Sequence, residues 1–229
     1  MTRRAILISA LPTSASSAAP ASHAEAWHRF LLSNPGGAWS DQEITRLNNP
    51  DREATLAAVR AAKEADYSFL VFAGRGEIRK GDLPWPEAHL LLSDGGSVSE
   101  AELNSGTPRC TLLFDWSNGA STQPAGPGGG ADQAGNQSRA LFDQALQKAE
   151  GGLVKIFASQ TDVPAGHGPS FSALLLHAAQ EWTRTNHGIL SLQQAVSLVT
   201  AAIPNTNPAL KAEYQGGRRL HHFPLAVST

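Results

Sequence analysis

Short, almost continuous apolar runs that alternate with helical patterns restrict the fold of this chain more than any other feature. Four of them have the length of strands: residues 5–8, 67–73, 110–114 and 153–158. Such a run is typical of a strand buried on both faces, and strands of this kind belong to parallel sheets covered by helices. The sequence therefore predicts an α/β fold of three layers, α/β/α, with a mostly parallel central sheet of about six strands.

Helix patterns fill much of the chain between these runs. In the helix expected at 23–33, Trp27, Phe30 and Leu31 share one face. In the helix expected at 51–65, Asp51 is placed to cap the amino end. Helices are expected at residues 23–33, 51–65, 139–150, 171–184 and 192–202.

The remaining segments give weaker patterns. Short strands are expected at 43–47 and 89–92, and a short helix capped by Ser99 is expected to run to Leu103. Residues 120–138 are rich in Gly, Pro, Ala and Gln, so they are predicted to form a flexible loop. From Pro204 onward we expect loop until a last strand at 220–227.

Composition excludes several classes of function. The net charge of −2 gives no basic excess for nucleic acid or for an acidic membrane surface. A single cysteine, Cys110, rules out internal disulfides and a cysteine-rich metal site, and it suits a reducing cytoplasm. The apolar run that follows Arg3 and Arg4 is only about seven residues long before Pro12, so we interpret it as a buried first strand and not as a signal peptide.

Two buried runs end in polar segments at the carboxyl edge of the predicted sheet, where open α/β sheets form their sites. The first continues as Ala73-Gly74-Arg75-Gly76, and the second as Asp115-Trp116-Ser117-Asn118-Gly119. These segments resemble the Ser-Gly-His-Gly type and Asp-x-Cys-x-Ser-Gly type motifs of bacterial members of the caspase and metacaspase family. The resemblance covers nearly the whole chain, because further similar segments agree in order: one precedes these motifs, at 36–39, and three follow them, at 156–160, 170–175 and 223–225.

The resemblance implies a single caspase-like domain over residues 1–229, in which Arg75 holds the catalytic His position and Ser117 the Cys position. A guanidinium stays protonated and has no acceptor, so Arg75 cannot take a proton from a nucleophile. A serine hydroxyl is far less acidic than a thiol and needs such a base. Loss of a nucleophile–base unit lowers the catalytic rate of an enzyme by about 10⁴ to 10⁶. We therefore expect this chain to be a catalytically degenerate relative of the caspase and metacaspase family.

Asp115, Arg75 and Trp116 each have more than one possible role in the motifs. Asp115 matches the acidic residue that helps bind a basic substrate side chain in metacaspase-like members, so the resemblance implies a remnant substrate groove at Asp115 and His167. Arg75 and Asp115 belong to neighbouring strand ends, where they either form a bidentate ion pair or leave Arg75 in solvent. Trp116 either plugs the old pocket or packs in the core.

The histidines and the cysteine are the remaining candidates to replace the missing catalytic groups. His89 or His167 could serve Ser117 as a base, but the sequence supplies no orienting partner, and a solvated loop histidine is the simpler interpretation of His167. Cys110 begins a strand whose far end faces the site, so a small buried apolar role is expected. Adjacent strand residues point to opposite faces, so the His221-His222 pair is not expected to bind metal.

Three functions stay open at this stage. The first is a non-catalytic interaction or regulatory module in the cytoplasm, which binds a protein or peptide, an active caspase-like protease or a second copy of itself. The second is an active hydrolase that uses Ser117 and an unrecognised base. The third is a different α/β protein, such as a small-molecule binding domain. No metal, cofactor, nucleic acid or membrane is expected to take part.

Overall fold

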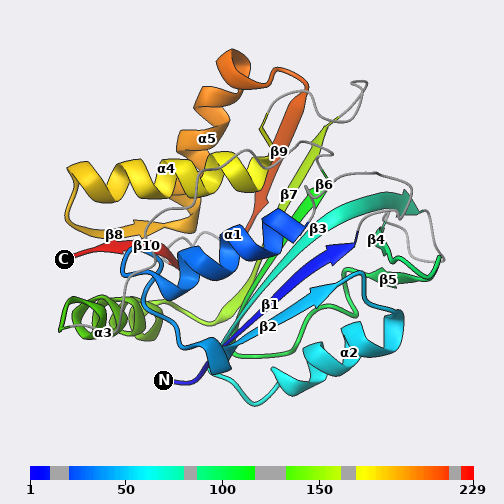
Figure 1. Cartoon of the computed structure of the whole chain (residues 1–229), viewed down its shortest axis with the longest axis horizontal. Helices are drawn as coiled ribbons and strands as arrows, with labels where there is room; N and C mark the ends of the chain where they lie inside the picture. The colour runs from blue at the N-terminus through cyan, green and yellow to red at the C-terminus, as the bar shows by residue number, and fades with distance from the viewer. Residues whose placement is uncertain (11–20, 80–86, 117–132, 161–168, 217–222) are drawn as a thin grey trace.

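The computed structural model describes residues 1–10, 21–79, 87–116, 133–160, 169–216 and 223–229 (Figure 1). Its central sheet has the strand order β2-β1-β3-β6-β7-β9, in which the first five strands are parallel and β9 is antiparallel to β7. The strands are β1 (Arg3–Ala10), β2 (Ile44–Asn48), β3 (Tyr67–Arg79), β6 (Arg109–Trp116), β7 (Gly152–Gln160) and β9 (Leu210–Gln215). The prediction of a mostly parallel sheet of about six strands is confirmed.

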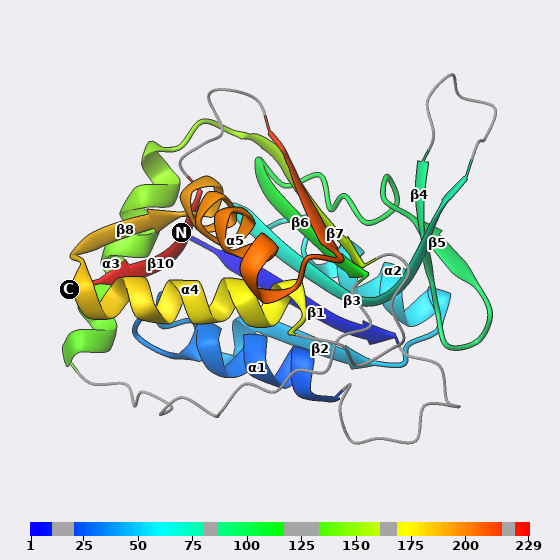
Figure 2. The same ribbon diagram turned by 90° about the horizontal axis from the view of Figure 1, so that it is seen from above.

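Helices cover both faces of the sheet (Figure 2). One face packs against α1 (Ala21–Leu32), α4 (Phe171–Thr185) and α5 (Leu192–Thr206), with α3 (Gln133–Lys148) beside them. The other face packs against α2 (Arg52–Ala61), whose amino end is capped by Asp51 through a 2.7 Å bond from the Ala54 amide. A two-stranded ribbon of β8 (Gly188–Ser191) and β10 (Pro224–Ser228) completes the fold beside α3.

The strand β3 shows why the apolar runs are continuous. Phe69 and Val71 belong to the core under α1 and α4, whereas Leu70 and Phe72 belong to the core on the α2 side. Because successive side chains of a strand point to opposite faces, a strand covered by helices on both sides needs apolar residues at every position.

The sequence pattern predicted that the glycines after Ala73 end this strand, but β3 continues through them to Arg79. Beyond Gly74, β3 pairs antiparallel with β4 (Glu87–Leu91), which pairs with β5 (Ser97–Ser99). Gly76 serves a close approach: a Cβ there would lie 2.2 Å from Cε2 of Trp116, which packs across it. The helix expected from Ser99 to Leu103 is instead the end of β5 and a turn.

Two segments predicted as loops contain regular structure. Helix α3 begins at Gln133, so the last part of the predicted loop 120–138 is helical, and buried Ser138 shows that packing outweighs its low-complexity composition. The rest of that loop lies outside the described residues.

The predicted loop after Pro204 contains the strand β9. Its alternate residues face the α5 layer, and the residues between them are exposed: Leu210, Ala212 and Tyr214 are of the first kind, and Lys211, Glu213 and Gln215 of the second. Within the described ranges, no helix is long and apolar enough to cross a bilayer.

Candidate functional site

The two motif segments lie on adjacent parallel strands. In the register of β3 and β6, Ala73 is the partner of Asp115. Arg75 is therefore two residues past this pair on β3, and Ser117 follows Asp115 by two residues in the sequence. Ser117 and His167 fall outside the described residues, so what the structure gives directly is the surroundings of Arg75, Asp115 and Trp116.

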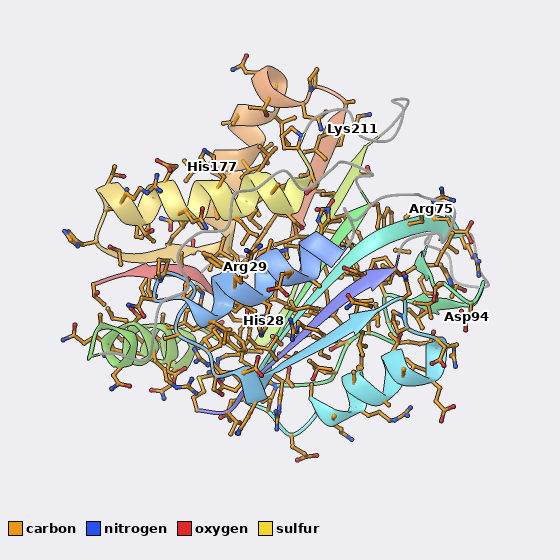
Figure 3. All side chains as sticks on the ribbon, viewed as in Figure 1. His28, Arg29, Arg75, Asp94, His177 and Lys211 are labelled. Carbon is orange, nitrogen blue, oxygen red and sulfur yellow. The ribbon has the colours of Figure 1, made fainter. Side chains whose placement is uncertain are left out.

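Arg75 is exposed on β3, just past the last pair that this strand forms with β6 (Figure 3). Its backbone pairs with Leu91 of β4. Its guanidinium makes no hydrogen bond or ion pair with any other described residue, and the ion pair to Asp115 weighed above is absent. The alternative, an Arg75 side chain in solvent, is the one found.

Asp115 is wholly buried, with 0% of its surface exposed. Its Oδ2 accepts a 2.7 Å hydrogen bond from the backbone N–H of Ser172, the second residue of α4. The side chain of Ser170 caps the same helix by accepting from the Ala173 amide at 3.1 Å. The free N–H groups and positive end of a helix favour a carboxylate at this place, which explains how the charge is buried. The burial of Asp115 also explains why it does not pair with Arg75.

The Asp115→Ala substitution is expected to lower the free energy of unfolding by about 2 kcal/mol, because it leaves the Ser172 amide buried and without this acceptor. Urea unfolding followed by circular dichroism measures the change. Asp115→Asn keeps an oxygen acceptor and should cost less. Glu64→Ala, at an exposed carboxylate, is the matched control and should stay within about 0.5 kcal/mol. An Asp115→Ala protein as stable as the control would show that the contact with α4 does not stabilise the fold.

Trp116 packs in the core on the α2 side of the sheet, opposite to Asp115. Its ring centroid lies 6.5 Å from that of Phe114 and 6.0 Å from that of Phe157. Core packing, one of the two alternatives for this residue, is therefore what the structure shows. Its Nε1 is buried without a hydrogen-bond partner among the described residues.

Two of the other candidate residues, His89 and Cys110, lie away from the Ala73–Asp115 pair. His89 lies on β4 opposite Glu77, with Nε2 3.4 Å from the Glu87 carboxylate. Cys110 pairs in register with Ser68, near the opposite end of both strands, and burial raises the pKa of its thiol. This confirms Cys110 as a small buried residue. The His221-His222 pair lies outside the described residues. Among the residues that are described, no cluster of His, Cys, Asp and Glu side chains could hold a metal ion.

The structure contains a charged cluster that no sequence pattern indicated. Arg3, treated above only as a flank of the first strand, is 1% exposed. Its guanidinium lies 4.5 Å above the Trp39 ring and 3.5 and 3.4 Å from the carboxylates of Glu43 and Asp143. Its partners come from distant segments, so no local pattern identifies them. The cluster lies at the amino end of β1, where Arg3 pairs with Tyr67, eight residues before Arg75 on β3.

Comparisons with known proteins identify the fold. No protein-family model matches the sequence, and no curated protein matches it. Among solved structures, protein GSU0716 from Geobacter sulfurreducens has a TM-score of 0.58 and 16% identity, with 100% of both chains covered. Caspase-1 from Spodoptera frugiperda has a TM-score of 0.52 and 10% identity, with 92% of this chain and 87% of that chain covered. The chain therefore has a caspase-like α/β fold, and identities this low show the fold alone.

Proposed function

We propose that this chain is a non-catalytic caspase-like domain that acts as an interaction or regulatory module. The observation that carries the proposal is the position of Arg75. It is an exposed cation on β3, just past the last pair with β6, the strand that leads to Ser117, and the family resemblance places the catalytic His at this position. A group that is always protonated supplies no general base to a serine hydroxyl.

The surroundings of Asp115 support the same proposal. In metacaspase-like relatives the matching acidic residue helps bind a basic side chain, which requires an accessible carboxylate. Here the carboxylate is wholly buried and accepts from the amino end of α4. The proton acceptor of the family pattern is therefore replaced by a cation, and the acid that matches its accessible carboxylate is buried in a contact with α4.

A module of this kind binds a protein or peptide. We propose an active caspase-like protease or a second copy of the chain as this partner, and the cytoplasm as the compartment, which one buried, reduced cysteine suits. The proposed role needs no metal and no cofactor.

Labelling with a serine-directed fluorophosphonate tests the proposal. We expect no modification of Ser117 in the folded protein, as judged by mass spectrometry of the intact chain and of its peptides. We also expect no cleavage of fluorogenic peptides after Lys or Arg. Stoichiometric labelling of Ser117 would overturn the proposal and would favour the alternative, a hydrolase with Ser117 as nucleophile.

The double substitution Arg75→His with Ser117→Cys, made in the same chain, tests the assignment of the two positions. Cleavage gained by this variant and absent from each single variant would support Arg75 and Ser117 as the former dyad. The single variants are the matched controls, because each restores only one member of the unit.

A further inference from the structure

The helix α5 carries no charge on its solvent face. It contains no Asp, Glu, Lys or Arg over its 15 residues, although these residue types make up 17% of the chain. The solvent face of a helix normally carries charged or polar residues, but here it includes Leu198, which is 49% exposed. One exposed leucine is ordinary by itself. This leucine, however, borders a hollow in the surface, so the two features have to be explained together.

The hollow has a volume of about 440 Å³ and lies where α4, β8 and α5 come side by side (Figure 2). Its lining consists of Trp182 from α4, Leu190 from β8, and Gln193, Gln194, Ser197, Leu198 and Ala201 from α5. None of these residues is charged. Trp182 and Leu190 also pack in the main hydrophobic core, so they give the hollow fixed apolar walls. The charged neighbours of Trp182 on α4, Glu181 and Arg184, are paired with each other.

A second hollow, of about 590 Å³, lies between α5 and β9. Ser197 and Ala201 line both hollows, and the only charge in the lining of the second one is the carboxylate of Glu213. Residues 193–201 of α5 therefore border the two hollows along about 12 Å of helix axis, which is about two turns. We call this surface the α5 groove. Its length suits a second helix, whose side chains recur on one face once per turn.

We infer that the α5 groove binds an amphipathic helix of a partner protein, and that the contact is made by apolar side chains spaced one turn apart. The inference rests on the proposed function, because it names the surface through which an interaction module would act. A charged side chain in the first hollow would lose water without gaining a counter-charge from the lining. A leucine or phenylalanine instead covers Leu198 and packs against Trp182, while the carboxamide of Gln193, unpaired among the described residues, stays available for a hydrogen bond to the partner.

Fluorescence anisotropy with the full chain tests this inference. The probe is a fluorescein-labelled helical peptide of about four turns, in which Leu recurs once per turn on one face and Gln, Ala and Lys fill the rest. Its counterpart has the same composition in an order that leaves no apolar face. We expect the amphipathic peptide to bind at least about tenfold more tightly than the counterpart. The preference should persist as salt is added, because the contact is apolar.

Variants assign the effect to the groove. Leu198→Glu should weaken binding of the amphipathic peptide at least about tenfold, because it places a charge in the apolar contact. Ala201→Arg should weaken binding similarly by filling the groove, and both positions are exposed, so the fold should tolerate the changes. Ile78→Glu is the matched control. It puts the same charge on another exposed large apolar side chain, on β3, and should leave binding unchanged.

Several results would overturn the inference: equal binding of the two peptides, binding of neither, or equal effects of Leu198→Glu and Ile78→Glu. Sedimentation velocity adds a further check. Self-association of the chain that Leu198→Glu abolishes would assign the groove to a second copy and not to the helix of another protein. The fluorophosphonate result is independent of all these outcomes, so a failed inference leaves the non-catalytic proposal standing.

Discussion

The Glu43→Gln substitution is expected to lower the free energy of unfolding by about 3 kcal/mol at neutral pH, because it removes the central anion of a partly buried charge cluster. Glu43 Oε1 and Oε2 accept from Arg139 at 2.6 and 2.9 Å, and Oε2 also accepts from the Ser40 amide at 2.7 Å. Arg3 lies 3.5 Å from the same carboxylate with its own side chain fully buried. A neutral amide at Glu43 would leave the buried Arg3 charge poorly compensated.

The same cluster predicts how stability depends on pH. Burial by itself would raise the pKa of Glu43, but the hydrogen bonds from Arg139 and Ser40 and the charge of Arg3 outweigh it and lower the pKa from 4.5 to about 2. The folded protein thus keeps this carboxylate charged at pH values where the unfolded chain binds a proton. Its contribution to stability is complete above pH 4.5 and is lost as the pH falls toward 2.

Urea unfolding from neutral pH to about pH 3 measures both effects. The stability of the wild-type protein should fall more steeply below pH 4.5 than that of Glu43→Gln, so the difference between the two proteins should shrink. The matched control is Glu25→Gln, which breaks an exposed ion pair with Arg46 and should cost no more than about 1 kcal/mol. A constant difference between wild type and Glu43→Gln over this pH range would contradict the role given to the carboxylate.

The sequence predicted the central sheet well, because its signal is local. The apolar run of β3 follows directly from burial on both faces, and the Asp51 cap of α2 lies within four residues of the amide that it accepts from. Strands with a weaker local pattern were missed. In β9, only alternate residues are buried, and its polar positions led us to expect a loop.

The site could be predicted only in part, because its decisive contacts join distant parts of the chain. The motif spacing correctly brought Ala73 and Asp115 to adjacent strands. No sequence pattern indicates that Asp115 accepts from Ser172, which lies 57 residues later in the chain. The close approach of Trp116 to Gly76 is likewise a tertiary contact, so the glycine was interpreted as the end of the strand.

Phe223→Ala is the second substitution with a large expected effect. Phe223 is 0% exposed and precedes β10, and its ring centroid lies 5.7 Å from that of Tyr67 on β3. Its carbonyl accepts from the Leu192 amide at 2.8 Å, at the start of α5. The side chain therefore joins the C-terminal ribbon to the central sheet. Removing a fully buried phenylalanine leaves a cavity and costs about 3–5 kcal/mol.

Thermal unfolding followed by tryptophan fluorescence should place the Tm of Phe223→Ala about 10 °C below that of the wild type, given the size of the chain. Phe223→Leu fills most of the cavity and should lose only about 1 kcal/mol. Ile78→Ala truncates a side chain that is 58% exposed and should change stability by less than about 0.5 kcal/mol. If Phe223→Ala behaved like Ile78→Ala, the C-terminal ribbon would contribute little to the core, and its packing against Tyr67 would not stabilise the sheet.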